Sequence, residues 1–374
     1  MKNINLHLSK SHIRSDEILR VTKHLRFSRN NVLFVGKPLL RWGYRAITTN
    51  TNELGEGDIV KLYPDGLCKV LWSRGSIHNV LFTTPACNVK CLMCPQPPCS
   101  DNVQVHKDNL KILSLIDYDP KVICISGGEP FLFPDRVKAY FEIINRRWPS
   151  CQVDVLTNAT RLSKFSLCKE IALASPINTT FCVSLHSDVA KVQQKINRVG
   201  TSFKDAVCGI NNLGKLRQMI EIRPVITKAN YRYLYDFAVF IVRNFPYVSH
   251  VAFMGQEIVG CARNNYDEIW VDPTDYIENL HQAVEYLDQM RICVSIYNIP
   301  LCLLPKNLHR FATRSISDWK QGYTPVCSGC KLRDECCGVF LTSGQYLSRG
   351  ISPPPGTPPP RLTRSRPSTW ASCA

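Results

Sequence analysis

Residues 80–94 of this 374-residue chain read VLFTTPACNVKCLMC, a short run of strand-forming residues followed by three closely spaced cysteines. Residues 80–84 predict a β-strand, so Cys87, Cys91 and Cys94 lie on the loop that follows it. Three thiolates on one short loop can bind three irons of a cubane [4Fe–4S] cluster and leave the fourth iron without a protein ligand. The spacing therefore predicts an iron–sulfur site with one open iron.

Zinc is the alternative metal for these thiols. Structural zinc is usually closed by four ligands in paired Cys-x-x-Cys or Cys/His sets, and this loop offers no nearby pair. Cys99, which follows Pro97 and Pro98, is the residue that would complete a zinc set. The cluster is the favoured reading, with zinc left open.

The chain outward from this loop alternates β-branched runs with helical periodicity between about residues 80 and 300. Further strands are expected at 122–126, 152–157, 180–185, 220–225, 249–253 and 292–297. One helix is expected around an apolar face that runs from Val137 to Trp148, and another from Asp272 as N-cap with Pro273 next. Repeated βα units predict an α/β fold with a parallel sheet, here a partial (β/α)6 TIM-like barrel, with its chemistry at the C-terminal ends of the strands.

Composition divides the chain into four predicted parts. Residues 1–79 form an N-terminal extension with a β-hairpin around Pro64-Asp65-Gly66, and residues 80–298 form the barrel. Residues 299–345 are rich in cysteine, and residues 346–374 are a Pro/Arg-rich tail that cannot pack a core and reads as disordered. The tail is also consistent with a frameshifted terminus, so no role is assigned to it.

Charge and hydropathy limit the classes of partner. The two ends, residues 1–50 and 349–374, carry +12 of the net charge of +16, which is typical of solvated segments and makes a nucleic-acid substrate a weak inference. No apolar run is long enough to span a membrane, and the opening residues lack a signal-peptide pattern. We expect a cytoplasmic protein with no membrane partner.

Eighteen cysteines in a cytoplasmic chain of this size are not expected to form a disulfide scaffold, because the cytosol keeps thiols reduced. Most of those outside two clusters stand singly among apolar residues and are expected to be small core residues: Cys124, Cys151, Cys168, Cys182, Cys208 and Cys293. Metal binding is therefore the leading interpretation for the two clusters alone.

The three-cysteine spacing resembles the cluster loop of the radical S-adenosylmethionine (SAM) superfamily. Gly127-Gly128-Glu129-Pro130, after the second barrel strand, resembles the superfamily's motif for the SAM amino group, in which Glu129 accepts from the ammonium. The resemblance extends to three further SAM-binding candidates at later positions: Asn158, Ser184 and Arg198. It implies an enzyme that reductively cleaves SAM to a 5′-deoxyadenosyl radical, which then removes a hydrogen atom from a substrate.

The second cysteine group resembles part of the auxiliary-cluster domain of peptide-modifying radical SAM enzymes. Its members are Cys327, Cys330, Cys336 and Cys337, and Cys302 is the plausible fourth ligand beside the first three. One auxiliary [4Fe–4S] cluster is the best fit, and zinc stays a rival because four thiolates suit either metal.

A closer resemblance covers roughly residues 56–345 and rests on the stretches CLMCPQPP, SIYNIPLC and SISDWK. These are similar to the C-type maturase of the bacterial His-Xaa-Ser system. The likeness implies a His-Xaa-Ser repeat peptide as substrate, a second radical SAM maturase as partner, and a low-potential electron donor such as flavodoxin or ferredoxin. The alternatives are a radical SAM enzyme that modifies RNA and a non-catalytic metal-binding interaction protein.

Overall fold

The structure is a computed structural model, and it describes residues 3–5, 15–22, 32–35, 46–47, 54–65 and 67–351. Its main sheet has eight strands in the order β14-β13-β12-β11-β10-β9-β8-β7. The strands are β7 (Val80–Phe82), β8 (Val122–Ser126), β9 (Gln152–Thr157), β10 (Thr179–Val183), β11 (Met219–Ile222), β12 (His250–Met254), β13 (Cys293–Tyr297) and β14 (Ala312–Thr313). All neighbouring strands are parallel and follow chain order, as repeated βα units require.

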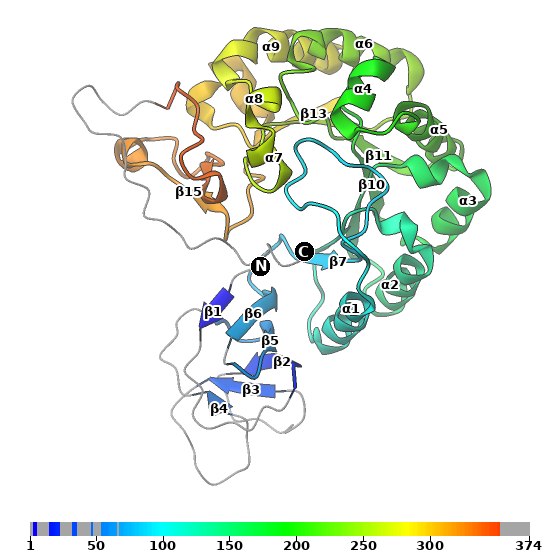
Figure 1. The fold of residues 1–374 in the computed structure, drawn as a ribbon, viewed down its shortest axis with the longest axis vertical. Helices are drawn as coiled ribbons and strands as arrows, with labels where there is room; N and C mark the ends of the chain where they lie inside the picture. The colour runs from blue at the N-terminus through cyan, green and yellow to red at the C-terminus, as the bar shows by residue number, and fades with distance from the viewer. Residues whose placement is uncertain are drawn as a thin grey trace.

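Helices connect these strands and lie along the outer side of the curved sheet, so that the unit is a partial barrel (Figure 1). They are α1 (Val103–Leu115), α2 (Pro134–Arg147), α3 (Phe165–Ala174), α4 (Ala190–Asn197), α5 (Ser202–Lys215), α6 (Leu234–Asn244) and α9 (Pro273–Gln289). The short helices α7 (Cys261–Asn264) and α8 (Tyr266–Ile269) lie instead beside the loop after β7 (Figure 1). Helix α9 begins as the sequence predicts. The Asp272 side chain accepts a hydrogen bond from the Thr274 amide, and Pro273 has no backbone N–H that would need an acceptor.

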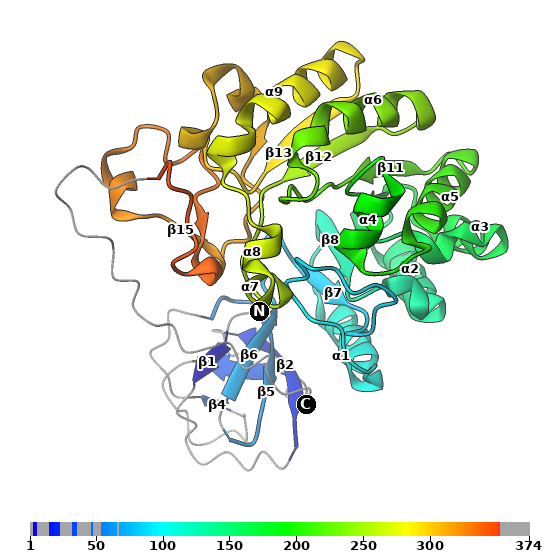
Figure 2. The same ribbon diagram turned by 45° about the horizontal axis from the view of Figure 1, so that its top comes forward.

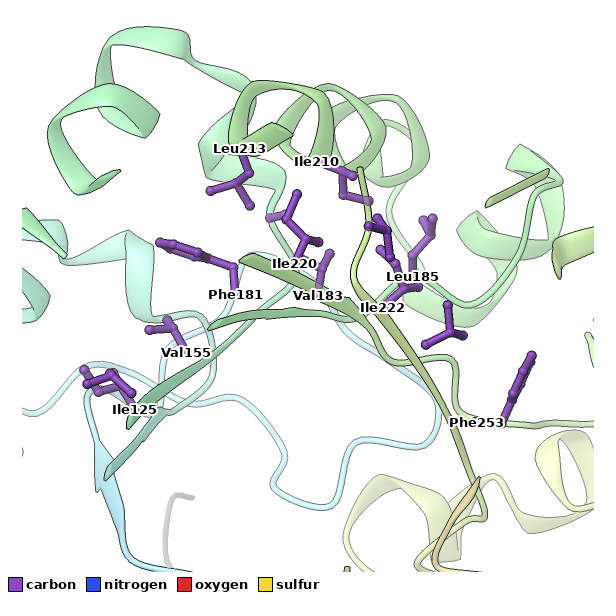
Figure 3. Close-up of a cluster of buried hydrophobic side chains, with 14 of the residues drawn as sticks. Ile125, Val155, Phe181, Val183, Leu185, Ile210, Leu213, Ile220, Ile222 and Phe253 are labelled. Atoms are coloured by element: carbon purple, nitrogen blue, oxygen red, sulfur yellow. The ribbon is translucent and has the colours of Figure 1, made fainter. Parts of the chain in front are cut away.

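The core lies between the sheet and these outer helices. Val155, Phe181 and Ile220 alternate with polar residues along their strands and are fully buried against the helix layer (Figure 3). Because side chains alternate across a strand, Asp154 and Glu221 occupy the opposite, concave face of the sheet. The barrel thus has an apolar outer side and a polar inner side.

A second, six-stranded sheet precedes the barrel, in the order β1-β6-β5-β2-β3-β4. Its strands are β1 (Asn3–Asn5), β2 (Glu17–Thr22), β3 (Val32–Val35), β4 (Ala46–Ile47), β5 (Ile59–Leu62) and β6 (Leu67–Trp72). Lys61 of β5 lies 2.8 Å from Asp108 of α1, and the Trp72 indole donates to the Tyr118 hydroxyl at 2.9 Å. Figure 2 shows this sheet beside α1 and β7, so it packs on the first βα unit of the barrel.

The α/β architecture and the parallel sheet confirm the predicted fold class. Strands β8 and β9 have the predicted bounds, whereas β10 and β11 end earlier than expected at Val183 and Ile222. The expected hairpin forms as β5 and β6, but the sequence did not predict that they join further strands in one sheet. The predicted tail after residue 351 lies outside the described residues, and no described helix is long and apolar enough to span a membrane.

Candidate functional site

The first three cysteines lie on the loop after β7, where they are partly buried. Backbone hydrogen bonds from Lys90 to Asn197 (3.0 Å) and from Leu92 to Ile196 (2.9 Å) hold this loop against the C-terminal end of α4. Within the loop, the Cys94 amide donates to the Cys91 carbonyl at 3.1 Å, which makes a tight turn. The loop is therefore anchored by main-chain contacts from a segment about a hundred residues away.

The environment of the three thiols fits a metal cluster. Burial raises the pKa of Cys87, Cys91 and Cys94, that of Cys94 to about 11, and the neighbouring thiols raise the pKa of Cys91 further. Thiols so close together lose their protons together only when a cation compensates the charge. Within the described residues, no three Cys, His, Asp or Glu side chains converge on a single ion, and a cubane places each thiolate on a different iron.

Gly128 explains why the second motif begins with glycines. A Cβ there would lie 2.1 Å from the carbonyl oxygen of Ala86, just before Cys87. The Gly128 and Glu129 amides donate to the carbonyls of Thr84 and Ala86 at 2.7 and 2.9 Å. The loop after β8 therefore packs directly against the base of the cysteine loop, and only glycine fits at this contact.

Glu129 is fully buried, and its carboxylate accepts three hydrogen bonds. The donors are the Thr157 hydroxyl at 2.7 Å, the Asn158 amide at 2.8 Å and the Phe131 amide at 3.1 Å. Burial raises the pKa of Glu129 to about 6 despite these donors. Since a carboxylate has about four acceptor positions, this one ties the β8 and β9 loops together and keeps one position for a further donor.

The three further SAM-binding candidates, Asn158, Ser184 and Arg198, lie around the same end of the sheet. The Asn158 side chain donates to Oδ1 of Asn88 at 2.9 Å, inside the cysteine loop, and lies 3.9 Å from the sulfur of Cys87. Ser184 follows β10 directly, with its amide on the Thr157 carbonyl at 2.9 Å. The structure thus brings Asn158 to the cysteine loop and Ser184 to the neighbouring strand end.

Arg198 ends α4 in a left-handed conformation, with half of its side chain exposed. Its guanidinium lies 3.6 Å from the carboxylate of Glu268 and 3.4 Å from Oδ1 of Asn265. Arg198 is therefore next to the cysteine loop but already has an anionic neighbour. A ligand carboxylate would have to share or replace Glu268.

Sequence reasoning missed several residues that support the loop. Asn197 is buried, and its side chain accepts from the Cys91 thiol at 3.3 Å. The Asn265 amide donates to the Leu92 carbonyl at 3.0 Å, and the Cys261 backbone amide donates to the Cys94 carbonyl at 2.9 Å. The position of Asn197 beside Arg198 was the only available signal for it.

The second cysteine group comes together after the barrel. Burial raises the pKa of Cys302 to about 11, and the charges of Cys336, Cys327 and Cys330 raise it further, although no three of the described thiols lie close enough to hold one ion. The Cys336 sulfur accepts from the backbone amides of Leu301 and Gly338, both at 3.4 Å. Together with a hydrogen bond from Cys337, these donors lower the pKa of Cys336, which suits a metal-bound thiolate.

One loop, residues 255–272, contacts both cysteine-bearing segments. On one side it reaches the first loop through Cys261 and Asn265. On the other side Glu257 lies 2.8 Å from Lys320, and the Ile258 amide donates to the Ser343 hydroxyl at 2.9 Å. Figures 1 and 2 show α7 and α8 between the first loop and the segment that carries β15 (Gln321–Gly322).

Part of the barrel matches a known family. Residues 81–238, which include the first cysteine loop and the Gly-Gly-Glu-Pro motif, match the radical SAM superfamily. This stretch is similar to radical SAM domains. It contains β7 through the start of α6.

Several solved structures resemble part of this chain. They include anSMEcpe with bound AdoMet (17% identity, TM-score 0.44, 57% of this chain and 60% of that one) and SuiB of Streptococcus suis bound to S-adenosylmethionine (14%, 0.41, 58% and 46%). A radical SAM methyltransferase from Sphaerobacter thermophilus aligns at 12% identity with a TM-score of 0.41 over 67% of this chain and 75% of that one. The chain spans 60% or less of the first two, and no curated protein matches it.

Proposed function

We propose that this protein is a radical SAM enzyme in which Cys87, Cys91 and Cys94 hold a [4Fe–4S] cluster. The single observation that carries the proposal is the joint anchoring of the cysteine loop by the β8 loop and the end of α4. When bound, the cluster and SAM supply a reductively generated 5′-deoxyadenosyl radical. The protein's own residues have to hold both partners in one orientation and exclude water.

Six residues are proposed to hold SAM, at the C-terminal ends of the strands and of α4. Gly127 and Gly128 allow close approach of the backbone, and Glu129 offers its remaining acceptor position to the SAM ammonium. Asn158 and Ser184 line the adjacent strand ends. Arg198 is proposed for the SAM carboxylate, in exchange for part of its contact with Glu268.

The proposed substrate is a peptide, of the His-Xaa-Ser repeat type. Support comes from the motif resemblance and from the second group of thiols directly after the barrel, which is proposed to hold one auxiliary [4Fe–4S] cluster. A second radical SAM maturase and a flavodoxin or ferredoxin as electron donor are the proposed partners, in the cytoplasm.

The test is release of 5′-deoxyadenosine from SAM by anaerobically reconstituted protein with dithionite. The triple variant Cys87→Ala, Cys91→Ala, Cys94→Ala should release none. Cys99→Ala, on the same loop, is the matched control and should keep wild-type release, whereas zinc bound through Cys99 would make that variant lose metal. Release that persists in the triple variant would refute the proposal.

A further inference from the structure

The concave face of the sheet carries a polar cluster that takes no part in the site described above. Its members come from β9, β11, β12 and β13 or the residue just after β11: Asp154, Glu221, Arg223, His250, Ser295 and Tyr297. The strand register places Glu221 beside His250, whereas Asp154 is opposite Thr180 of β10, one strand further from Glu221. The outer face of the same strands is apolar, so the polar residues are confined to the inside of the barrel.

Most of this cluster is mutually satisfied. Nδ1 of His250 lies 2.7 Å from one oxygen of Glu221, and Nε2 of His250 lies 2.9 Å from the Ser295 hydroxyl. The other oxygen of Glu221 accepts from Nε of Arg223, whose guanidinium lies over the ring of Tyr297. The single cation, Arg223, therefore neutralises Glu221, whose side chain is 7% exposed.

Asp154 is the exception. In the part of the chain that the structure describes, its one side-chain hydrogen bond comes from the neutral amide of Gln152 at 3.0 Å, and it has no ion pair. Burial raises the pKa of Asp154, because the charged form is poorly solvated there, whereas the Gln152 hydrogen bond and the charge of the more distant Arg223 lower it in part. On the inner face, no cation among the described residues contacts the Asp154 carboxylate.

We infer that Asp154 receives a cationic group of the substrate inside the barrel. The inference rests on the proposed peptide substrate and adds the chemistry of the group that is recognised: an imidazolium, ammonium or guanidinium. Asp154 precedes the SAM candidate Asn158 by four residues, about 13 Å of strand. The recognised cation would therefore lie deeper in the barrel than SAM, and it would fix the peptide while a neighbouring residue reacts.

Binding of labelled peptides measures this without turnover. Fluorescence anisotropy would be recorded with reconstituted protein and SAM, without reductant, at pH 6.0, where most imidazoles are charged. Three synthetic peptides are compared: the His-Xaa-Ser repeat, the same peptide with every His replaced by Lys, and the same peptide with every His replaced by Gln. The wild type should bind the two cationic peptides roughly tenfold more tightly than the Gln peptide.

Asp154→Asn should remove that preference, so that all three peptides bind as the Gln peptide does. Asp135→Asn, on the exposed outer surface of α2, is the matched control and should keep the preference. SAM binding and the thermal midpoint report whether Asp154→Asn is folded. The inference is wrong if Asp154→Asn still prefers the cationic peptides. It is also wrong if the variant binds the Gln peptide more weakly by the same factor as the cationic ones.

Peptide binding by the wild-type protein distinguishes failure of this inference from failure of the proposed function. Equal binding of all three peptides overturns the inference and leaves the peptide substrate in place. No binding of any peptide overturns the inference together with the proposed His-Xaa-Ser substrate, and the SAM-cleavage assay still reports on the radical SAM activity.

Discussion

The Cys91 thiol donates a hydrogen bond of 3.3 Å to Oδ1 of Asn197, which lies 106 residues later in the chain. Asn197 also accepts from the Lys90 amide through its backbone carbonyl, so one buried residue contacts the loop twice. With Cys91 as a metal-bound thiolate, a flip of the amide would present an N–H to the sulfur instead. In either orientation the Asn197 side chain can form a hydrogen bond with Cys91.

Asn197→Ala should therefore lower the iron retained by the first site and reduce stability by roughly 1–3 kcal/mol, the usual effect of leaving a buried polar group unpaired. Iron analysis and urea unfolding measure the two effects. The control is Asn244→Ala, an exposed asparagine at the end of α6 that bonds only its own helix. Equal iron content in the two variants would contradict the supporting role of Asn197.

Gly128→Ala should disrupt the contact between the β8 loop and the cysteine loop, because the new methyl group would overlap the Ala86 carbonyl. We expect a loss of roughly 1–3 kcal/mol and weaker SAM binding. Gly75→Ala is the matched control, since its Cβ would meet no atom within 4 Å. Unchanged stability and SAM affinity in Gly128→Ala would show that the two loops do not need this close approach.

Glu129 should make the stability of the metal-free protein depend on pH. Its folded pKa, raised to about 6, lies above the value of 4.5 for an exposed glutamate. A raised carboxyl pKa gives stability that is present below the unfolded pKa and is lost as pH rises through the folded pKa. Relative to Glu129→Gln, the wild type should lose about 2 kcal/mol between pH 4.5 and pH 7. Urea unfolding at several pH values measures this, and a constant difference would disprove it.

Glu129→Ala also tests the proposed bond to SAM. A charge-assisted hydrogen bond contributes roughly 1.5–3 kcal/mol, so SAM affinity should fall at least tenfold. The three donors that Glu129 satisfies would also lose their acceptor, so the variant must be shown to be folded. Thr157→Val removes one of these donors without touching the carboxylate, and it should leave SAM affinity nearly unchanged.

The second cysteine group predicts a metal count. With two cubane clusters the wild type should hold about eight irons, and the triple alanine variant of the first loop about half. Cys327→Ala with Cys330→Ala should remove the other half, whereas a change at Cys336 is ambiguous because Cys337 is adjacent. Zinc without iron in the first-loop variant would identify the second group as a structural zinc site.

Local sequence patterns predicted most of the barrel. Its strands are runs of β-branched residues, and its helices show clear apolar periodicity. The cap at Asp272 and the bounds of β8 and β9 follow from such local rules. Asn197 and Cys261 could not be found in this way, since their contacts with the first loop depend on tertiary packing. The register that places Asp154 inside the barrel likewise follows from the sheet and not from its neighbours in sequence.

The segment formed by residues 255–272 contacts both cysteine-bearing parts of the chain. On one side it forms hydrogen bonds with the first cysteine loop. On the other side, Glu257 and Ile258 form an ion pair and a hydrogen bond with the C-terminal segment. A chain cut before Cys327 would keep the ion pair of Glu257 with Lys320 but would lose the hydrogen bond of Ile258 to Ser343, together with Cys327, Cys330 and Cys336. The two cysteine groups are thus linked through one segment, and removing the later group by truncation would also remove a contact that supports the segment beside the earlier group.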